Sequence, residues 1–198
     1  MDAQVGETRG AWLRRAAMLG GGLMSGGIVT AALASFASSS SSKQDVEVLN
    51  FALAFEELQA DFYARSLHSV SLKGEWLQFA QVVGGHERDH VAFLRHALGS
   101  AAKPAPQLTL TRAPSSFSDF QRLAIGLEDT GVALYNGQAG NLTPKSLASA
   151  AEIVSVEARH ASWARDLAGE VPAPVATDVP ADVSQVKAQL TQLGVQVG

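Results

Sequence analysis

The stretch Gly85-His86-Glu87-Arg88-Asp89-His90 contains the pattern Glu-x-x-His, and Val156-Glu157-Ala158-Arg159-His160 repeats it. Residues three apart lie on one face of a helix, so each pair can direct a carboxylate and an imidazole at the same point. A single Glu-x-x-His is common by chance. Two copies in similar surroundings indicate a repeated structural unit.

Each copy follows a lone glutamate that has a tyrosine seven residues after it. These upstream pairs are Glu56 with Tyr63 and Glu128 with Tyr135. Glu56 precedes the first pattern by 31 residues, and Glu128 precedes the second by 29 residues. The spacing predicts two copies of one metal-binding helical hairpin.

Four segments with apolar residues at helical spacing predict the helices of these hairpins, at residues 45–67, 75–98, 118–139 and 144–168. Short turns separate the first from the second and the third from the fourth. The 16 residues 100–115 contain three prolines and no helical pattern. Such a segment can extend to roughly 50 Å, whereas a 24-residue helix is about 36 Å long. We therefore expect an all-α fold, an antiparallel four-helix bundle with one long crossover between its second and third helices.

Residues 1–37 have the layout of an export signal. Arg14 and Arg15, which resemble a twin-arginine signal, directly precede residues 16–37, which carry no charge and are rich in Ala, Gly, Leu and Met. The alternative is an uncleaved membrane anchor, because such a run can span a bilayer; the many glycines favour a cleaved signal. Both interpretations place the rest of the chain outside the cytoplasm, in the periplasm or cell envelope.

The segments that flank the predicted bundle divide the chain further. Residues 38–44 are serine-rich and predict a flexible linker. The bundle is expected at residues 45–169. Residues 170–198 predict a proline-rich tail with a short helix near residues 181–193, packed on the outside of the bundle.

Composition limits the chemistry that the chain can carry. It has 198 residues, a formal net charge of −4 and no cysteine. The charge predicts no nucleic-acid partner. Without cysteine there is no disulfide, thiolate metal site or thiol nucleophile. Any metal must therefore be held by carboxylates and imidazoles.

The polar residues on the predicted inner faces supply four carboxylates and two imidazoles: Glu56, Glu87, His90, Glu128, Glu157 and His160. Four negative charges match two divalent cations, whereas the same carboxylates without metal would repel one another. An oxygen-rich set with imidazole suits iron first and manganese second, and zinc less well. We expect Glu87 and Glu157 to bridge the two ions.

The remaining roles follow from this arrangement. Glu56 and Glu128 are predicted as terminal or bridging ligands, and His90 and His160 as completing one ion each. Tyr63 and Tyr135 are predicted as hydrogen-bond partners of the ligands or electron donors, with core packing as the alternative for both.

Two other interpretations use the same residues. His86-Glu87-Arg88-Asp89-His90 also matches His-Glu-x-x-His, the zinc peptidase motif, but this leaves Glu56, Glu128, Glu157 and His160 without a role. On the bundle interpretation, His86 is turned away from the site and partly exposed. The six inward residues could also form a purely structural polar network.

At these residues the sequence resembles the bacterial ferritin-like domain proteins of the desiccation-related type, and more distantly bacterioferritin, rubrerythrin and manganese catalase. The resemblance covers about residues 48–169. It rests on Leu49-Asn50-Phe51-Ala52-Leu53 with Glu56 and Phe62-Tyr63, on Glu87-x-x-His90 with Phe93-Leu94, on Leu127-Glu128-Asp129 with Tyr135, and on Val156-Glu157-Ala158-Arg159-His160. It implies a ferritin-like bundle whose di-iron or di-manganese centre reacts with oxygen or peroxide. Gln59 departs from it, because relatives often carry a second glutamate there.

The expected function is oxidation of ferrous iron or breakdown of peroxide in stress protection. Oxygen or peroxide would be the substrate, and the membrane a partner only through an uncleaved N-terminal segment. The alternative is a non-enzymatic, metal-stabilised envelope or scaffold protein. A homodimer is compatible with this prediction, whereas a storage cage is not expected, because an N-terminal signal or anchor would obstruct its assembly.

Overall fold

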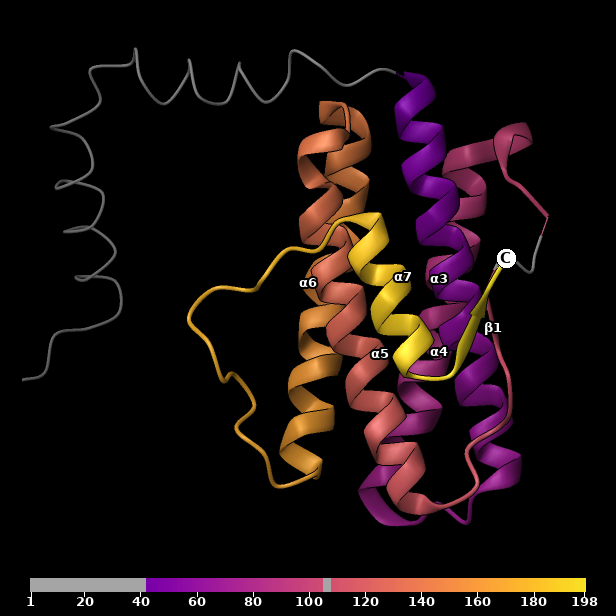
Figure 1. The fold of residues 1–198 in the computed structure, drawn as a ribbon, viewed down its shortest axis with the longest axis vertical. Helices are drawn as coiled ribbons and strands as arrows, with labels where there is room; N and C mark the ends of the chain where they lie inside the picture. Colours follow the sequence, from indigo (N-terminus) through magenta and orange to yellow (C-terminus); the bar gives the residue numbers. More distant parts are fainter. Residues whose placement is uncertain (1–41, 105–107) are drawn as a thin grey trace, which may run out of the picture. The chain divides into compact units, whose positions relative to one another are not determined.

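The computed structural model describes residues 42–104 and 108–198, and four long helices form its bundle (Figure 1). They are α3 (Ser42–Ser69), α4 (Gly74–Leu98), α5 (Phe117–Gln138) and α6 (Pro144–Leu167). Within the bundle α3 packs along α4, and α5 packs along α6. This arrangement confirms the predicted all-α bundle. The predicted signal or anchor at residues 1–37 lies outside the described residues.

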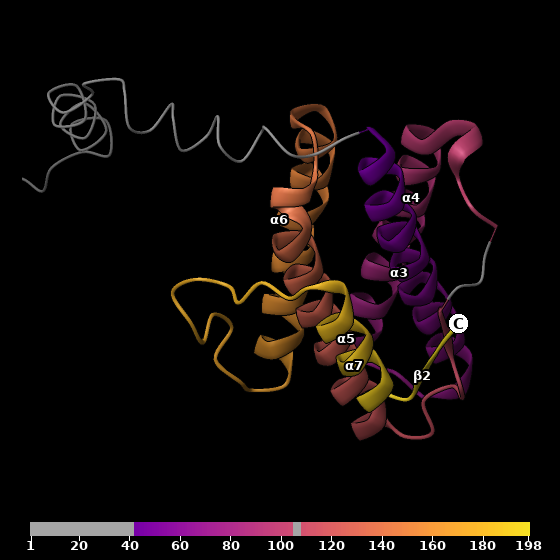
Figure 2. The ribbon, with the colours of Figure 1, turned by 45° about the horizontal axis from the view of Figure 1, so that its top comes forward.

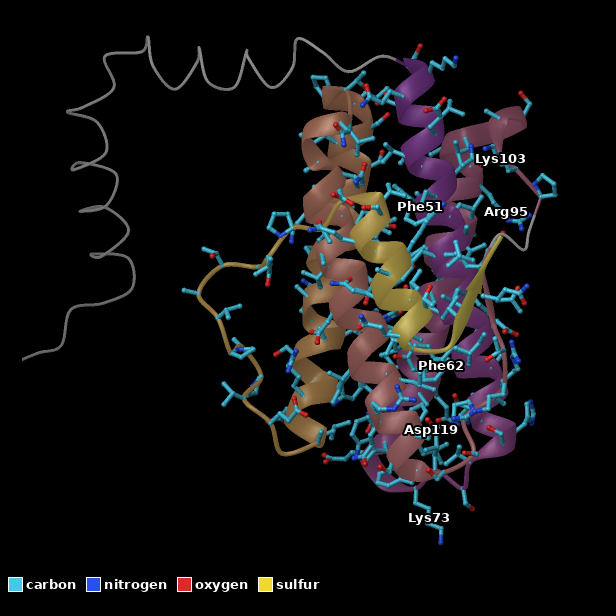
Figure 3. All side chains as sticks on the ribbon, viewed as in Figure 1. Phe51, Phe62, Lys73, Arg95, Lys103 and Asp119 are labelled. Atoms are coloured by element: carbon cyan, nitrogen blue, oxygen red, sulfur yellow. The ribbon has the colours of Figure 1, made fainter. Side chains whose placement is uncertain are left out.

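The connection between α4 and α5 runs along the bundle. Lys73, just before α4, lies at one end, and Lys103, just after this helix, lies towards the other (Figure 3). Asp119, in the first turn of α5, lies back near the end marked by Lys73. The chain therefore returns over most of the length of α4 before α5 begins, which is the predicted crossover.

Local signals explain where the helices begin. The Ser116 hydroxyl accepts a hydrogen bond from the Asp119 backbone N–H at 3.1 Å and caps α5. Pro144 occupies the first position of α6, where its missing N–H has no intrahelical partner to lose. Thr143 occupies the N-cap position of α6, but its side chain forms no capping hydrogen bond. Its backbone N–H instead donates to Asp45 at 2.8 Å, which joins the start of α6 to the start of α3.

A small sheet, which no pattern in the sequence predicted, holds the crossover. Strand β1 (Leu108–Leu110) pairs antiparallel with β2 (Val195–Val197), with Thr109 opposite Gln196. Between α6 and β2, helix α7 (Val183–Gln192) packs on the outside of α5 (Figure 2). The tail thus contacts α5 through α7 and the crossover through β2.

The bundle interior contains two apolar clusters. The larger includes Phe55, Phe62 and Phe120, together with Tyr63. The smaller is built around residues such as Leu49 and Leu94, together with Tyr135. Helices α3 and α4 approach closely near Tyr63. A Cβ placed on Gly84 would lie only 2.8 Å from the Tyr63 Cβ. Within residues 42–104 and 108–198, no helix has the length and apolar character needed to cross a membrane.

Candidate metal centre

All six predicted inward-facing residues meet in the interior of the bundle. Helix α3 supplies Glu56 and α5 supplies Glu128, whereas α4 and α6 each supply a glutamate with a histidine three residues later. The four glutamates are fully buried, and His90 and His160 are 9% and 3% exposed. Mid-helix positions on four inward faces thus bring the side chains to one place.

The six side chains form two overlapping groups. One consists of Glu56, Glu87, His90 and Glu157, and the other of Glu87, Glu128, Glu157 and His160. Within each group, one ligand atom from every residue lies within 4.8 Å of those from the others. Glu87 and Glu157 belong to both groups. The geometry suits two neighbouring cations that share these two carboxylates.

Both histidines direct Nδ1 at the carboxylates. His90 Nδ1 lies 3.0 Å from Glu87 Oε2, 3.2 Å from Glu157 Oε1 and 3.3 Å from Glu56 Oε2. His160 Nδ1 lies 3.1 Å from Glu87 Oε1 and 3.4 Å from Glu128 Oε2. Each imidazole therefore faces carboxylates of both hairpins.

Several of these atoms are buried and have no hydrogen bond to any described residue: Glu87 Oε1, Glu128 Oε2, Glu157 Oε1 and His160 Nδ1. His160 Nδ1 is close to two of these oxygens, but the atoms do not meet at hydrogen-bond geometry. Buried polar atoms are normally paired. Converging oxygen and nitrogen atoms without partners are the donor set that divalent cations bind, so the residues present fit metal ions.

Burial and mutual repulsion shift the protonation of the carboxylates. Burial raises the pKa of Glu56 to about 8, and the nearby Glu87 carboxylate adds to the rise. Burial likewise raises the pKa of Glu157 to about 8, with repulsion from Glu56. The pKa of Glu87 is raised for the same reasons, burial first and Glu157 second. The metal-free cluster therefore retains protons at neutral pH.

The pKa values of the two histidines are raised, whereas burial alone would lower the pKa of an imidazole. Burial alone would lower the pKa of His90, but the carboxylates of Glu157, Glu56 and Glu87 beside its Nδ1 outweigh burial and raise that pKa to about 12. The pKa of His160 rises to about 10, because Glu128 and Glu87 outweigh the burial of the ring. Metal ions would have to displace these protons, because only deprotonated ligands bind them.

Tyr63 and Tyr135 each form a hydrogen bond with the opposite hairpin. The Tyr63 hydroxyl donates to Glu128 Oε1 on α5, and the Tyr135 hydroxyl donates to Glu56 Oε1 on α3, both at 2.5 Å. The sequence associates each tyrosine with the glutamate seven residues before it, but the structure pairs it with the glutamate of the other hairpin. Burial, followed by the carboxylate charge, holds both tyrosine pKa values well above the usual range. Both phenols are therefore hydrogen-bond donors.

Glu157 is held by two further residues. Gln59 donates from Nε2 to Glu157 Oε2 at 3.3 Å. A Cβ placed on Gly131 would lie 2.8 Å from the same oxygen, so only glycine leaves room for the carboxylate there. The departure at Gln59 thus adds a neutral donor to the cluster.

The prediction that His86 is turned away from the site is wrong. The ring is exposed, but its Nδ1 lies 2.9 Å from His160 Nε2, and the two rings stack with centroids 5.1 Å apart. His86 is one helical step from Glu87, on the edge of α4 that borders α6, so the contact depends on how these helices are placed. Spacing along one helix could not reveal it.

The same contact disagrees with the zinc peptidase interpretation. That interpretation needs His86 and His90 to share one ion. In the structure His90 belongs to the buried cluster, whereas His86 belongs to neither group and lies on the outer side of His160. His68 and His96 are exposed.

A surface pocket of about 460 Å³ opens between α4 and α6 over the two imidazoles. Its lining includes His86, Asp89, His90, Val156, Arg159 and His160. A second pocket, of about 1070 Å³, lies between α5, α6 and the tail and is lined by none of the six cluster residues. The pocket between α4 and α6 therefore gives solvent a route to the two histidines of the cluster.

A family model for the ferritin-like domain matches residues 44–170, which contain nearly all of the four bundle helices. The chain therefore belongs to the ferritin-like domain family, which confirms the resemblance seen in the sequence. Among curated proteins, no sequence matches the chain. Family, fold and buried cluster agree on one class of protein, a ferritin-like bundle whose interior can hold metal ions.

Proposed function

We propose that the protein binds two divalent cations, iron first and manganese second, as a dinuclear centre. The observation that carries the proposal is the pair of overlapping donor groups that share Glu87 and Glu157. Four carboxylates balance the charge of two dications, and hard oxygens with imidazole nitrogen favour iron or manganese. Glu56 with His90, and Glu128 with His160, would complete one ion each.

The proposed activity is oxidation of ferrous iron or breakdown of peroxide in stress protection. Two redox-active ions, when bound, can exchange electrons with oxygen or peroxide. The chain's own part is to hold the shared carboxylates, to orient Glu56 and Glu128 through Tyr135 and Tyr63, and to exclude bulk water. The pocket between α4 and α6, of about 460 Å³, has the volume to hold oxygen or peroxide.

Metal content and turnover, measured together, test this proposal. Protein loaded with ferrous iron without oxygen should hold two ions per chain and oxidise them when oxygen or peroxide is added. Protein loaded with manganese should release oxygen from peroxide. The Glu87→Gln variant, which keeps the side-chain volume but removes a shared carboxylate, should lose at least one ion per chain and most of the turnover.

Glu152→Gln is the matched control, because Glu152 is exposed and lies on the same helix as Glu157. It should retain the metal content and turnover of the unchanged protein. A folded protein that binds neither metal would overturn the dinuclear centre. Two tightly bound ions without turnover in either assay would overturn the enzymatic activity and support the non-enzymatic, metal-stabilised alternative.

We also propose that the protein acts outside the cytoplasm. The support is the arginine pair Arg14-Arg15 directly before the uncharged residues 16–37. Cell fractionation tests this: the unchanged protein should be found in the periplasm or envelope, and the double variant Arg14→Lys, Arg15→Lys should accumulate in the cytoplasm. Equal distributions of the two proteins would contradict the proposal.

A further inference from the structure

The two halves of the cluster differ on the side that faces the pocket. His86 directly precedes Glu87, and Val156 occupies the corresponding position before Glu157. His86 Nδ1 lies 2.9 Å from His160 Nε2. His90 makes its contacts through Nδ1, and its Nε2 has no hydrogen bond to the described part of the chain. The two copies of the repeat thus differ at this position. His160 has His86 as a neighbour on its outer side, whereas His90 has Val156 at the matching position.

The contact with His86 gives His160 a hydrogen-bond partner on the side of the ring that faces away from the carboxylates. His160 Nδ1 faces Glu87 and Glu128, so this nitrogen must offer its lone pair to the cation. Nε2 then carries the hydrogen and donates it to His86 Nδ1. An acceptor of this kind fixes the ring orientation and the tautomer of a metal-bound histidine and makes it a stronger ligand.

Within the described residues, no protein group supports His90 in this way. Val156, at the matching position, lines the pocket but has an apolar side chain that cannot accept a hydrogen bond. Asp89 and Arg159 line the same pocket, and neither forms a hydrogen bond with His90 or His160 in the described residues. The His90 side chain is 11% exposed and that of His160 is 4% exposed. Solvent in the pocket therefore reaches His90 more readily.

We propose that the centre has two unequal metal sites. The site with His160 binds its ion first and more tightly, and His86 is the positioning residue that makes it so. The site with His90 binds second and exchanges its ion through the pocket between α4 and α6. This inference rests on the proposed dinuclear centre. It adds that the site with His160 keeps its ion, whereas the site with His90 is the one that is filled and emptied.

Titration with cobalt(II) tests the inequality without any turnover. Bound cobalt is followed by its visible absorption and by calorimetry, and the unchanged protein should show two separate binding steps. His86→Ala should weaken the first step by about 10- to 100-fold, the usual effect of removing such an outer partner. The second step should be unchanged. His86→Asn, whose side-chain oxygen can accept the same hydrogen bond, should restore the first step to within a few-fold.

The pocket side of His90 offers the reciprocal experiment. Val156→His places an acceptor at the matching position and should strengthen the second step by about 10-fold, so that the two steps merge. Val156→Ala, which changes size without adding an acceptor, should leave both steps as they are. If the Val156→His chain does not fold, the comparison of His86→Ala with His86→Asn still decides.

The outcomes separate this inference from the proposed function. Two equal binding steps that His86→Ala leaves unchanged would overturn the inequality while the dinuclear centre stands. Equal weakening of both steps would also overturn it, because His86 would then act on the whole cluster. A folded protein that binds no cobalt, iron or manganese would overturn the proposed function itself.

Discussion

Tyr63 and Tyr135 show at the scale of single residues how the two hairpins depend on each other. Each phenol donates a hydrogen bond to a buried glutamate of the opposite hairpin. The tyrosines belong to different apolar clusters, so each cluster is joined to the centre by one hydroxyl. These two hydrogen bonds link core packing to the orientation of Glu128 and Glu56.

We expect Tyr63→Phe and Tyr135→Phe each to lower the free energy of unfolding of the metal-free protein by about 1–3 kcal/mol, because each leaves a buried carboxylate oxygen without its donor. Urea unfolding followed by circular dichroism measures the change. Since each tyrosine donates to a buried glutamate of the opposite hairpin, the two losses in the free energy of unfolding should be similar. A loss in only one variant would contradict this reciprocity.

The residues of the cluster could be predicted because a helix repeats its faces at a fixed period. Glu87 with His90, and Glu157 with His160, share a face through their spacing alone. His86 could not be assigned in this way, since its contact with His160 depends on the packing of α4 against α6. The partners of Tyr63 and Tyr135 were missed for the same reason, because they lie on other helices.

At the scale of elements, the helix boundaries were predictable wherever a local signal marks them. Ser116 and Pro144 mark the starts of α5 and α6 through capping and first-turn geometry. Helix α3 already includes Ser42, the first residue that the structure describes, and so extends at least three residues beyond its predicted start. Strands β1 and β2 were missed, since three residues show too little alternation to predict a strand and the two segments lie far apart in the sequence.

Gly137 determines how closely the tail can approach α5. A Cβ placed there would lie 1.9 Å from the Ala181 carbonyl oxygen, and the Ala181 N–H donates to the Ala133 carbonyl at 2.9 Å. Gly137→Ala must therefore displace the tail backbone. We expect a loss of about 1–3 kcal/mol of stability, as for other overpacked sites, and faster proteolysis of the segment between α6 and α7.

Thermal unfolding and limited proteolysis check this prediction, and Gly140→Ala is the control. A Cβ placed on Gly140 meets nothing within 4 Å, so this change should stay within about 0.5 kcal/mol. Equal behaviour of the two variants would show that the contact between the tail and α5 does not contribute to stability.

At the scale of the whole molecule, the raised pKa values make the stability of the metal-free protein depend on pH. The pKa values of Glu56 and Glu157 are about 8, against 4.5 for the usual side chain. Between these values the folded chain binds more protons than the unfolded chain, so its stability falls as pH rises. His90 and His160, with pKa values of about 12 and 10 against 6.5, contribute stability that is complete below pH 6.5 and is lost as pH rises further.

We therefore expect chelator-treated protein to unfold at a lower urea concentration at pH 9 than at pH 5. Bound metal should reduce or reverse this trend, because deprotonated ligands bind it better at high pH. At free metal about 100 times the dissociation constant, one site adds about 2.7 kcal/mol. A metal-free protein that becomes more stable between pH 5 and pH 9 would contradict the assigned protonation.

The overall architecture was predictable because the two hairpins repeat one pattern and the link between them is long enough to span a helix. What could not be predicted is how the crossover is held. That depends on β2 and α7, whose contacts with β1 and α5 join segments far apart in the sequence. The sequence predicted a short helix on the outside of the bundle, where α7 lies against α5, but it did not predict the pairing of β1 with β2.

The overlap of the donor groups has a practical consequence for a chain cut in two. Each hairpin supplies three residues of one donor group. The fourth residue comes from the other hairpin: Glu157 completes the group of the first hairpin, and Glu87 completes that of the second. A break just before Pro104 would leave β1 and β2 on the same piece. Neither fragment alone would hold a complete set of donors, so the colour of bound cobalt would appear only on reassembly. Fused to two other proteins, the fragments would report when those proteins meet.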